Sequence, residues 1–177
     1  MPLKNDMLRK YLSPCFIETG TYLGDGVQSA LDAGFAKVVS IELSFGQFFE
    51  RAVNRFKNDS RVLIVQGDSA DILFDVIKGI DTQMTFWLDG HWSGGDTAYG
   101  KFNSPLLSEI EQIGKHSIKN HIIIVDDMRC WITGNPDTPD ITFTEEDIQA
   151  KILTVNNYQF AYEDGYIPND ILIAQIK

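Results

Sequence analysis

The sequence has 177 residues, of which 44% are hydrophobic and 23% are charged, and these proportions are typical of one globular domain covering residues 1–177. Its formal net charge of −10 argues against a nucleic-acid partner, because such proteins need a basic surface that neutralises phosphates. No stretch is long and apolar enough to span a membrane, so we expect no membrane span.

Strands and helices alternate along the first half of the chain. Short apolar runs rich in β-branched and aromatic residues predict strands, and apolar residues at helical spacing predict helices. The predicted strands lie at 15–19, 37–43 and 61–67, and the predicted helices at 26–34, 44–58 and 69–80. Ser44 is expected to be the N-cap of the second helix.

The alternation continues through the next strand and helix. The apolar run at 83–89 predicts a strand. The helix predicted at 104–114 has Ser104 as its N-cap and Pro105 at its first position. The continuously apolar strand predicted at 121–127 belongs in the middle of a sheet, because both of its faces are buried.

The carboxyl-terminal part ends in a hairpin. A helix predicted at 144–156 begins with a capping box formed by Thr144 and Asp147. Two further strands, at 158–164 and 170–176, flank a short turn. Five strands separated by helices predict a parallel, Rossmann-like, doubly wound α/β sheet, and the hairpin makes seven strands with an antiparallel one at the end.

The stretch ETGTYLGDG, residues 18–26, is predicted to form the turn between the first strand and the first helix. Gly20, Gly24 and Gly26 let the backbone approach a ligand closely beside a helix N-terminus. Dinucleotide dehydrogenases space their glycines as G-x-G-x-x-G, which the G-x-x-x-G-x-G pattern here fits poorly. An ordinary tight turn is the alternative interpretation.

Two acids end the second and third strands. Glu42 lies about 20 residues beyond the glycine turn, the usual distance for an acid that accepts hydrogen bonds from ribose hydroxyls. Its alternative is a solvated acid at a strand end. Asp68 precedes a helix that Ser69 opens, so Asp68 is also a candidate N-cap, and the ligand and capping roles are compatible.

The order of these motifs resembles the class I methyltransferases that use S-adenosylmethionine (SAM), and the predicted sheet resembles theirs. By this resemblance Glu18 lies near the methionine amino group of the cofactor and Gly20 lets the cofactor pass. The resemblance implies that Glu42 binds the ribose and that Asp68 faces the adenine amino group. The full cofactor-binding set that it implies is Glu18, Gly20, Thr21, Gly24, Glu42, Asp68, Ser69 and Asp89.

Three acids at strand ends form a candidate metal site. Asp89 ends the strand at 83–89, and Asp126 and Asp127 end the strand at 121–127, so neighbouring strands would bring them together. Clustered carboxylates raise their own pKa values, and a hard divalent cation such as Mg²⁺ relieves the repulsion. The pattern resembles the metal-dependent O-methyltransferases, including the macrocin type that methylates sugar hydroxyls. Alternatively, the acids cap loops or pair with Arg129 and Lys101.

The loop WLDGHWSGGDT, residues 87–97, carries the candidate catalytic groups. His91 follows Asp89 by two residues, so both side chains can project from the same side of the chain. An imidazole with an unperturbed pKa of about 6.5 is well suited to accept the proton of an acceptor hydroxyl. Alternatively, His91 hydrogen-bonds to the backbone or ligates the metal, and Asp89 is then the base.

The acceptor pocket is expected to come from loops. Macrocin-type enzymes usually carry an amino-terminal helical region that lines this pocket, and about a dozen residues precede the first strand here. The segments 90–104 and 128–143 are long for unstructured connections, which are usually binding loops at that length. Their aromatic residues suit stacking on sugar rings or, alternatively, pack on the domain's own edge. They are Trp92, Tyr99, Phe102 and Trp131.

Two functions from different classes follow from these observations. The first is an O-methyltransferase acting on a saccharide or related small molecule, as in polysaccharide biosynthesis. The second is a non-catalytic binding module that keeps the fold. A reducing, cytoplasmic setting is expected, because Cys15 and Cys130 lie far apart and no signal-peptide core opens the sequence. A homodimer is compatible with the sequence.

Overall fold

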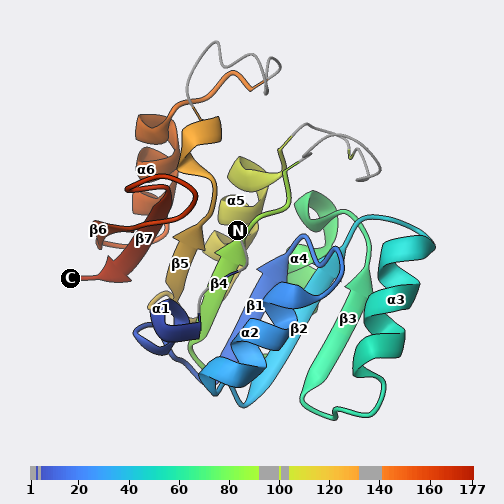
Figure 1. Ribbon diagram of the computed structural model, residues 1–177. Helices are drawn as coiled ribbons and strands as arrows, with labels where there is room; N and C mark the ends of the chain where they lie inside the picture. The colour runs from blue at the N-terminus through green and yellow to red at the C-terminus, as the bar shows by residue number, and fades with distance from the viewer. Residues whose placement is uncertain (1–2, 4, 92–99, 101–103, 132–140) are drawn as a thin grey trace.

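The computed structural model describes residues 3, 5–91, 100, 104–131 and 141–177. One mixed sheet of seven strands runs through it in the order β3-β2-β1-β4-β5-β7-β6 (Figure 1). The strands are β1 (Cys15–Thr19), β2 (Lys37–Glu42), β3 (Val62–Gln66), β4 (Met84–Leu88), β5 (Ile122–Val125), β6 (Tyr158–Glu163) and β7 (Ile171–Ile176). The helices are α1 (Asn5–Arg9), α2 (Asp25–Ala33), α3 (Gln47–Phe56), α4 (Ser69–Ile77), α5 (Leu106–Lys115), α6 (Glu145–Leu153) and the 3₁₀ helix η1 (Met128–Cys130).

The strand directions confirm the predicted topology. Strands β1 to β5 pair in parallel, whereas β7 is antiparallel to both β5 and β6. The chain places β2 and β3 on one side of β1 and then returns to place β4 on its other side. The carboxyl ends of β1 and β4 therefore mark the point where the strand order reverses, which is where open α/β sheets bind ligands.

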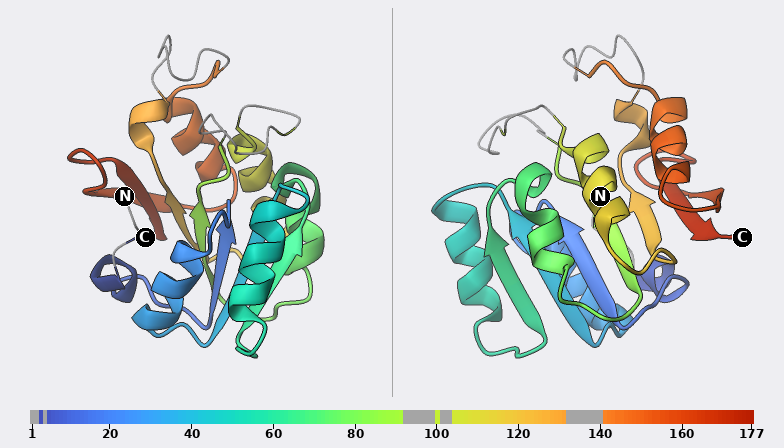
Figure 2. Two further views of the ribbon diagram at one scale, coloured as in Figure 1. Left: turned by 45° about the vertical axis from the view of Figure 1, so that its right-hand side comes forward. Right: turned by 180° about the vertical axis from the view of Figure 1, so that it is seen from behind.

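Helices cover both faces of the sheet (Figure 2). Helices α4, α5 and α6 pack on one face, in a core that includes Phe86 of β4 and Ile123 of β5. Helices α1 and α2, with Phe56 of α3, pack on the other face around Phe16 and Phe35. The sequence analysis did not predict α1, which buries Met7 and Leu8. No helix among the described residues is long and apolar enough to cross a membrane.

The predicted start of α3 was wrong. The helix begins at Gln47 after Gly46, and no side chain caps it. Ser44 lies before the helix start, and its backbone N–H donates to the Glu42 carboxylate at 2.8 Å. The observed N-cap, Gly46, lies two residues after the predicted one, and Ser44 is instead bonded to the end of β2.

The other helix starts are closer to expectation. Thr144 and Asp147 form the predicted capping box of α6. Asp68 is the N-cap of α4, and its carboxylate accepts the N–H of Ala70 at 2.9 Å. Pro105, not Ser104, is the cap residue of α5, although the Ser104 hydroxyl still accepts the N–H of Leu106 at 3.3 Å.

Candidate cofactor and catalytic site

The glycine turn meets the end of β4 at the point where the strand order reverses. Gly20 has a φ of 89°, and a Cβ there would lie 2.4 Å from the carbonyl oxygen of Asp89. Only glycine tolerates both the backbone conformation and this approach. The two turns that follow β1 and β4 are thus in direct backbone contact, and the site is built around their junction.

Glu18 lies beneath the glycine turn, with 2% of its surface exposed. The Ser40 hydroxyl donates to its Oε2 at 2.5 Å. A Cβ on residue 26 would lie 1.8 Å from its Oε1, so Gly26 leaves room for the carboxyl under α2. Burial raises the pKa of Glu18 to about 8, against the hydrogen bond from Ser40, which lowers it.

The remaining residues of the turn are held from below. The buried Thr21 hydroxyl shares a 2.6 Å hydrogen bond with Ser40. Gly24 has a φ of 82° and is the N-cap of α2, and a Cβ there would lie 2.6 Å from the Phe56 ring. Thr21 and Gly24 therefore stabilise the turn through contacts inside the domain. Their backbone groups could contact a ligand in addition.

Glu42 joins the end of β2 to the glycine turn. One carboxylate oxygen accepts the N–H of Tyr22 at 2.8 Å, and the other accepts the N–H of Ser44 at 2.8 Å. These bonds orient the carboxylate, and a carboxylate oxygen can accept more than one hydrogen bond. The structure therefore leaves acceptor capacity for the ribose hydroxyls that the sequence analysis assigned to Glu42.

Ser69 connects α4 to a residue that the sequence analysis missed. Its hydroxyl donates at 2.5 Å to Glu109 of α5, which is fully buried. Burial raises the pKa of Glu109 to about 7, against hydrogen bonds from Ser69 and Thr19. Among the described residues, its second oxygen, Oε2, has no hydrogen-bond partner. The clue in the sequence was an acid three residues after Leu106, on the apolar side of the predicted helix.

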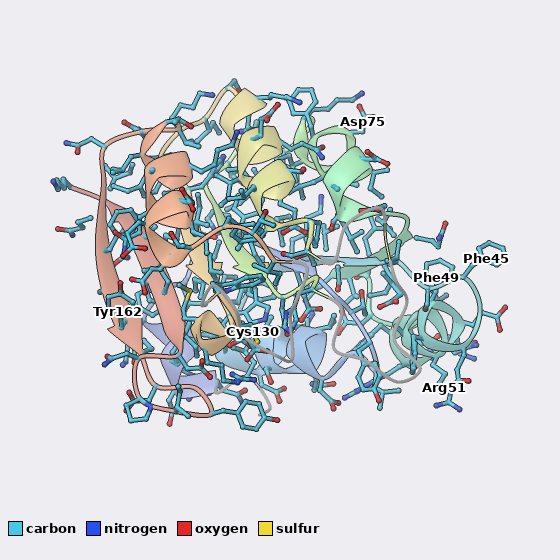
Figure 3. All side chains as sticks on the ribbon, turned by 90° about the horizontal axis from the view of Figure 1, so that it is seen from above. Phe45, Phe49, Arg51, Asp75, Cys130 and Tyr162 are labelled. Atoms are coloured by element: carbon cyan, nitrogen blue, oxygen red, sulfur yellow. The ribbon has the colours of Figure 1, made fainter. Side chains whose placement is uncertain are left out.

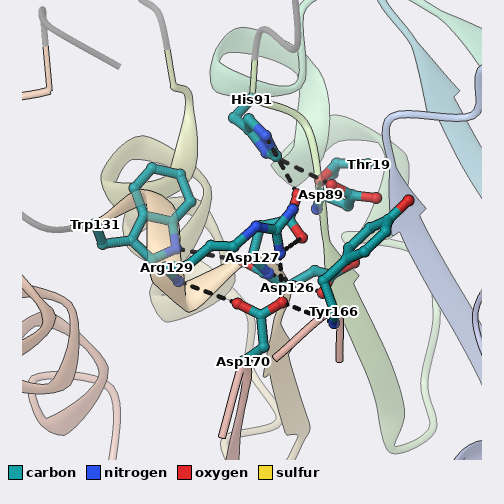
Figure 4. Close-up of polar contacts among 9 residues, drawn as sticks. All are labelled: Thr19, Asp89, His91, Asp126, Asp127, Arg129, Trp131, Tyr166 and Asp170. Carbon is teal, nitrogen blue, oxygen red and sulfur yellow. Dashed lines mark hydrogen bonds and ion pairs between the residues drawn. The ribbon is translucent and has the colours of Figure 1, made fainter. Parts of the chain in front are cut away.

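The three predicted metal-binding acids do come together. One carboxylate oxygen from each of Asp89, Asp126 and Asp127 lies within 4.8 Å of the others, at the ends of β4 and β5 (Figure 4). Burial and the neighbouring Asp127 charge raise the pKa of Asp126 to about 7. Burial, with the charges of Asp126 and Asp127, also raises the pKa of Asp89 well above its usual range. A cation would offset this mutual repulsion.

His91 lies between two of these acids. Its Nδ1 is 3.5 Å from Asp89 Oδ1, and its Nε2 is 3.4 Å from Asp127 Oδ2. Only 7% of its side chain is exposed, and its ring meets that of Trp131 edge to face with centroids 5.7 Å apart. Burial lowers the pKa of His91, so the neutral imidazole predominates near neutral pH.

Arg129 supplies the positive charge beside this cluster. Its Nη1 donates to Asp127 Oδ1 at 2.5 Å and also pairs with the buried Asp170. Its guanidinium lies 4.7 Å from the centre of the Tyr166 ring. The alternative in which an acid pairs with Arg129 is therefore confirmed for Asp127, while Lys101 lies outside the described residues. The contribution of Asp170 was not predicted.

The aromatic side chains of the long segments are only partly described. Trp131 is 3% exposed and stacks on Phe143 with ring centroids 5.4 Å apart. It packs inside the domain, as the alternative interpretation expected, and does not offer a stacking face. Trp92, Tyr99 and Phe102 lie outside the described residues.

Comparisons with known proteins give the class of fold. No protein-family model matches the sequence, and no curated protein matches it. Solved structures do match. The O-methyltransferase from Bacillus cereus in complex with SAH has a TM-score of 0.70 and 15% identity over 98% of this chain and 78% of that chain.

Two further matches are of the same kind. The O-methyltransferase TomG from Streptomyces achromogenes, involved in tomaymycin synthesis and in complex with SAM, has a TM-score of 0.67 and 14% identity over 98% of this chain and 77% of that chain. The SAH-bound methyltransferase PaMTH1 from Podospora anserina has a TM-score of 0.60 and 13% identity over 98% and 76%. This chain therefore has the fold of the class I SAM-dependent methyltransferases, as its motifs had indicated.

Proposed function

We propose that this protein transfers a methyl group from SAM to a hydroxyl group of a saccharide or a related small molecule. The observation that carries the proposal is the junction of two sets of residues at one sheet edge. The glycine turn and Glu42 form one set, and Asp89, His91 and Asp127 form the other, with Gly20 in contact with Asp89 between them.

The cofactor half of the site supports SAM binding. Glu42 is oriented by two backbone N–H groups and faces the glycine turn, so it is placed to accept the ribose hydroxyls. The Asp68 carboxylate accepts the N–H of Ala70, and it would also accept a hydrogen bond from the adenine amino group. The methionine part would then pass Gly20 toward Asp89.

The chemical step needs an acceptor for one proton. The hydroxyl oxygen attacks the methyl carbon of the sulfonium, the carbon–sulfur bond breaks, and its electron pair stays on sulfur in the neutral thioether product. The hydroxyl proton passes to His91, whose neutral imidazole suits this task, or to Asp89 beside it. Holding the donor and acceptor together supplies much of the rate enhancement.

A divalent cation fits the acid cluster. Asp89, Asp126 and Asp127 offer oxygen ligands within 4.8 Å of one another, and burial together with mutual repulsion raises the pKa values of Asp89 and Asp126. A cation would relieve the repulsion. When bound, the ion would lower the pKa of a hydroxyl group that it contacts. The protein side chains would hold and orient the acceptor around it.

The acceptor class rests on charge and chemistry. A formal net charge of −10 disfavours nucleic acid as the acceptor. Carboxylates and an imidazole suit a neutral polyhydroxyl compound, because they can accept hydrogen bonds from its hydroxyl groups and so orient it. We therefore place a small polyhydroxyl acceptor, such as a sugar of polysaccharide biosynthesis, ahead of a macromolecule.

Cofactor binding is the first test. SAM at about 100 times its Kd should raise the unfolding free energy by about 2.7 kcal/mol. NAD, the ligand of the dinucleotide dehydrogenases considered above, should leave the unfolding free energy unchanged. Thermal unfolding with each ligand measures both. A shift with SAM and no product in a methyl-transfer screen over sugars, read by product mass, would favour the non-catalytic binding module. The absence of any shift with SAM would exclude both the SAM-dependent enzyme and the proposed SAM-binding site.

A further inference from the structure

A second set of metal-type donors adjoins the acid cluster, and it includes a sulfur. His91, Asp127 and Cys130 each offer one donor atom, and the three atoms lie within 4.8 Å of one another. Cys130 ends η1, directly beyond β5, and Figure 3 places it above the ends of the central strands, far from Phe45 and Phe49. The turn after β4 brings His91 to the same place.

The spacing of two of these donors is that of metal ligands. His91 Nε2 and Asp127 Oδ2 are 3.4 Å apart, beyond the usual range of about 2.7–3.2 Å for a hydrogen bond to oxygen. Two ligands on a tetrahedral ion with bonds of about 2.0–2.1 Å are separated by about 3.3 Å. The distance between His91 Nε2 and Asp127 Oδ2 therefore matches the separation of two ligands on one tetrahedral ion.

The burial of His91 is the second, independent observation. Its side chain is 7% exposed, yet its Nδ1 makes no hydrogen bond with the residues that the structure describes. A buried polar atom without a partner is uncommon and costly. Histidines that bind metals through one nitrogen usually direct the other at a carboxylate, and Asp89 Oδ1 is 3.5 Å from Nδ1 in this arrangement.

The local charge also favours a cation. In the part of the chain that the structure describes, Asp127 and Asp170 pair with Arg129, and the acidic side chains of Asp89 and Asp126 lie nearby. Arg129 binds Oδ1 of Asp127 and leaves Oδ2 toward His91 (Figure 4). The guanidinium therefore orients one ligand without occupying the oxygen that faces the imidazole.

We propose that His91, Asp127 and Cys130 bind a borderline transition-metal ion of the Zn²⁺ type and prefer it to Mg²⁺. Imidazole and thiolate are ligands for such ions, whereas Mg²⁺ takes oxygen. Three protein ligands leave a fourth position open, as in catalytic rather than structural zinc sites. The thiol of Cys130 loses its proton on coordination.

This inference extends the proposed function by replacing the oxygen ligands Asp89 and Asp126 with His91 and Cys130, with Asp127 common to both sets. An ion on Nε2 occupies the lone pair that would accept the hydroxyl proton, so Asp89 becomes the base in the loaded protein. Metal binding is measured without SAM or acceptor. The metal proposal and the methyltransferase proposal can therefore fail separately.

Co²⁺ is the spectroscopic probe for the site. The full chain, freed of metal with chelator, should bind one equivalent of Co²⁺ and develop a thiolate-to-cobalt charge-transfer band. The Cys130→Ser variant should lose that band, and His91→Gln should bind Co²⁺ at least about 10-fold more weakly. Cys15→Ala is the matched control, because Cys15 is buried in β1 and should leave the band intact.

Competition and labelling complete the test. Zn²⁺ should displace Co²⁺ at stoichiometric amounts, and millimolar Mg²⁺ should not. Zn²⁺ should also slow alkylation of Cys130 in the unmodified chain, read by peptide mass with Cys15 as the internal reference, so a variant that misfolds does not decide the matter. A band that survives in Cys130→Ser, displacement by Mg²⁺, or alkylation of Cys130 that Zn²⁺ leaves unchanged would each overturn the proposal.

Discussion

The two halves of the site treat their acids differently. At the ends of β1 and β2, the chain itself satisfies Glu18 through Ser40 and satisfies Glu42 through two backbone N–H groups. At the ends of β4 and β5, carboxylates crowd within 4.8 Å of one another, and the nearby His91 Nδ1 has no hydrogen bond. In the first half, the chain itself orients the acids by hydrogen bonds without a ligand. In the second half, the acids lie close together and are only partly paired with other side chains.

Under the proposed function, this contrast separates the residues that bind the cofactor from those that act in the chemical step. A half whose groups are already oriented can bind a rigid ligand at little cost in ordering. A half with raised carboxyl pKa values and a buried neutral imidazole keeps groups ready to exchange a proton or to hold a cation. Substitutions in the two halves should therefore change different measurements.

The largest effect is expected in the acid half. His91→Gln should lower turnover by about 100-fold or more and leave SAM affinity nearly unchanged, because in the proposed function the imidazole takes the proton of the acceptor and does not bind the cofactor. Steady-state kinetics and calorimetric titration with SAM measure the two quantities. If excess Zn²⁺ restores the turnover of the variant, His91 is a metal ligand. If the turnover of the variant stays near the parent value, Asp89 is the base.

The converse change belongs to the cofactor half. Glu42→Ala should weaken SAM binding by about 1 to 3 kcal/mol, because ribose hydroxyls would lose a charged acceptor. Glu50→Ala, which removes an exposed acid from α3, is the matched control and should bind SAM normally. Circular dichroism checks that both variants are folded. If Glu42→Ala is folded and binds SAM with parent affinity, Glu42 does not contact the ribose.

The buried Glu18 predicts a pH dependence of stability. Its pKa in the folded protein is about 8 against 4.5 as the ordinary value, so the folded state holds the proton between these limits. The stability that this proton confers is complete below about pH 4.5 and is lost as the pH rises through about 8.

Glu18→Gln isolates this contribution. Between pH 5 and pH 7 the parent should lose about 2 kcal/mol of unfolding free energy relative to the variant, which has no proton to release. Urea unfolding at several pH values measures the difference. Parallel pH profiles for the two proteins would mean that Glu18 is ionised in the folded state and that its surroundings are more polar than the structure indicates.

The smallest change tests the metal ligands. Asp127→Asn should raise the half-saturating concentration of a divalent ion by about 10-fold, because a neutral amide is a weaker ligand. Asp75→Asn, an exposed acid of α4, is the control and should leave this concentration unchanged. Activity assays in chelator-treated protein supply the measurement, and full activity in excess chelator would exclude a metal requirement.

Local patterns in the sequence predicted much of the fold. Strand periodicity and the glycine turn placed β1, β2 and Glu42 correctly, because parallel strands have their carboxyl ends at one edge. The N-cap role of Asp68 was predicted as well, since an acid before a helix has few other local partners. Each of these predictions depended on neighbours within a few residues or on one strand-to-helix connection.

Contacts between distant segments could not be predicted in this way. Arg129 pairs with Asp170, which is 41 residues away and reaches the site only because β7 lies beside β5. Ser44, the predicted N-cap of α3, instead donates its backbone N–H to Glu42. Trp131 is buried by Phe143 across a segment whose path the sequence does not reveal. Each depends on how the chain returns to the sheet.

The fit between Gly26 and Glu18 links the variation of two positions. A methyl group on residue 26 would lie 1.8 Å from Glu18 Oε1, so alanine there requires the buried Glu18 carboxyl to move or residue 18 to be shorter, such as aspartate. Related sequences should therefore show glycine at position 26 wherever glutamate stands at 18, and larger residues at 26 only alongside a shortened partner. Alanine at 26 and aspartate at 18 should each destabilise the protein when introduced singly, and together they should restore much of the loss, in the manner of compensating substitutions.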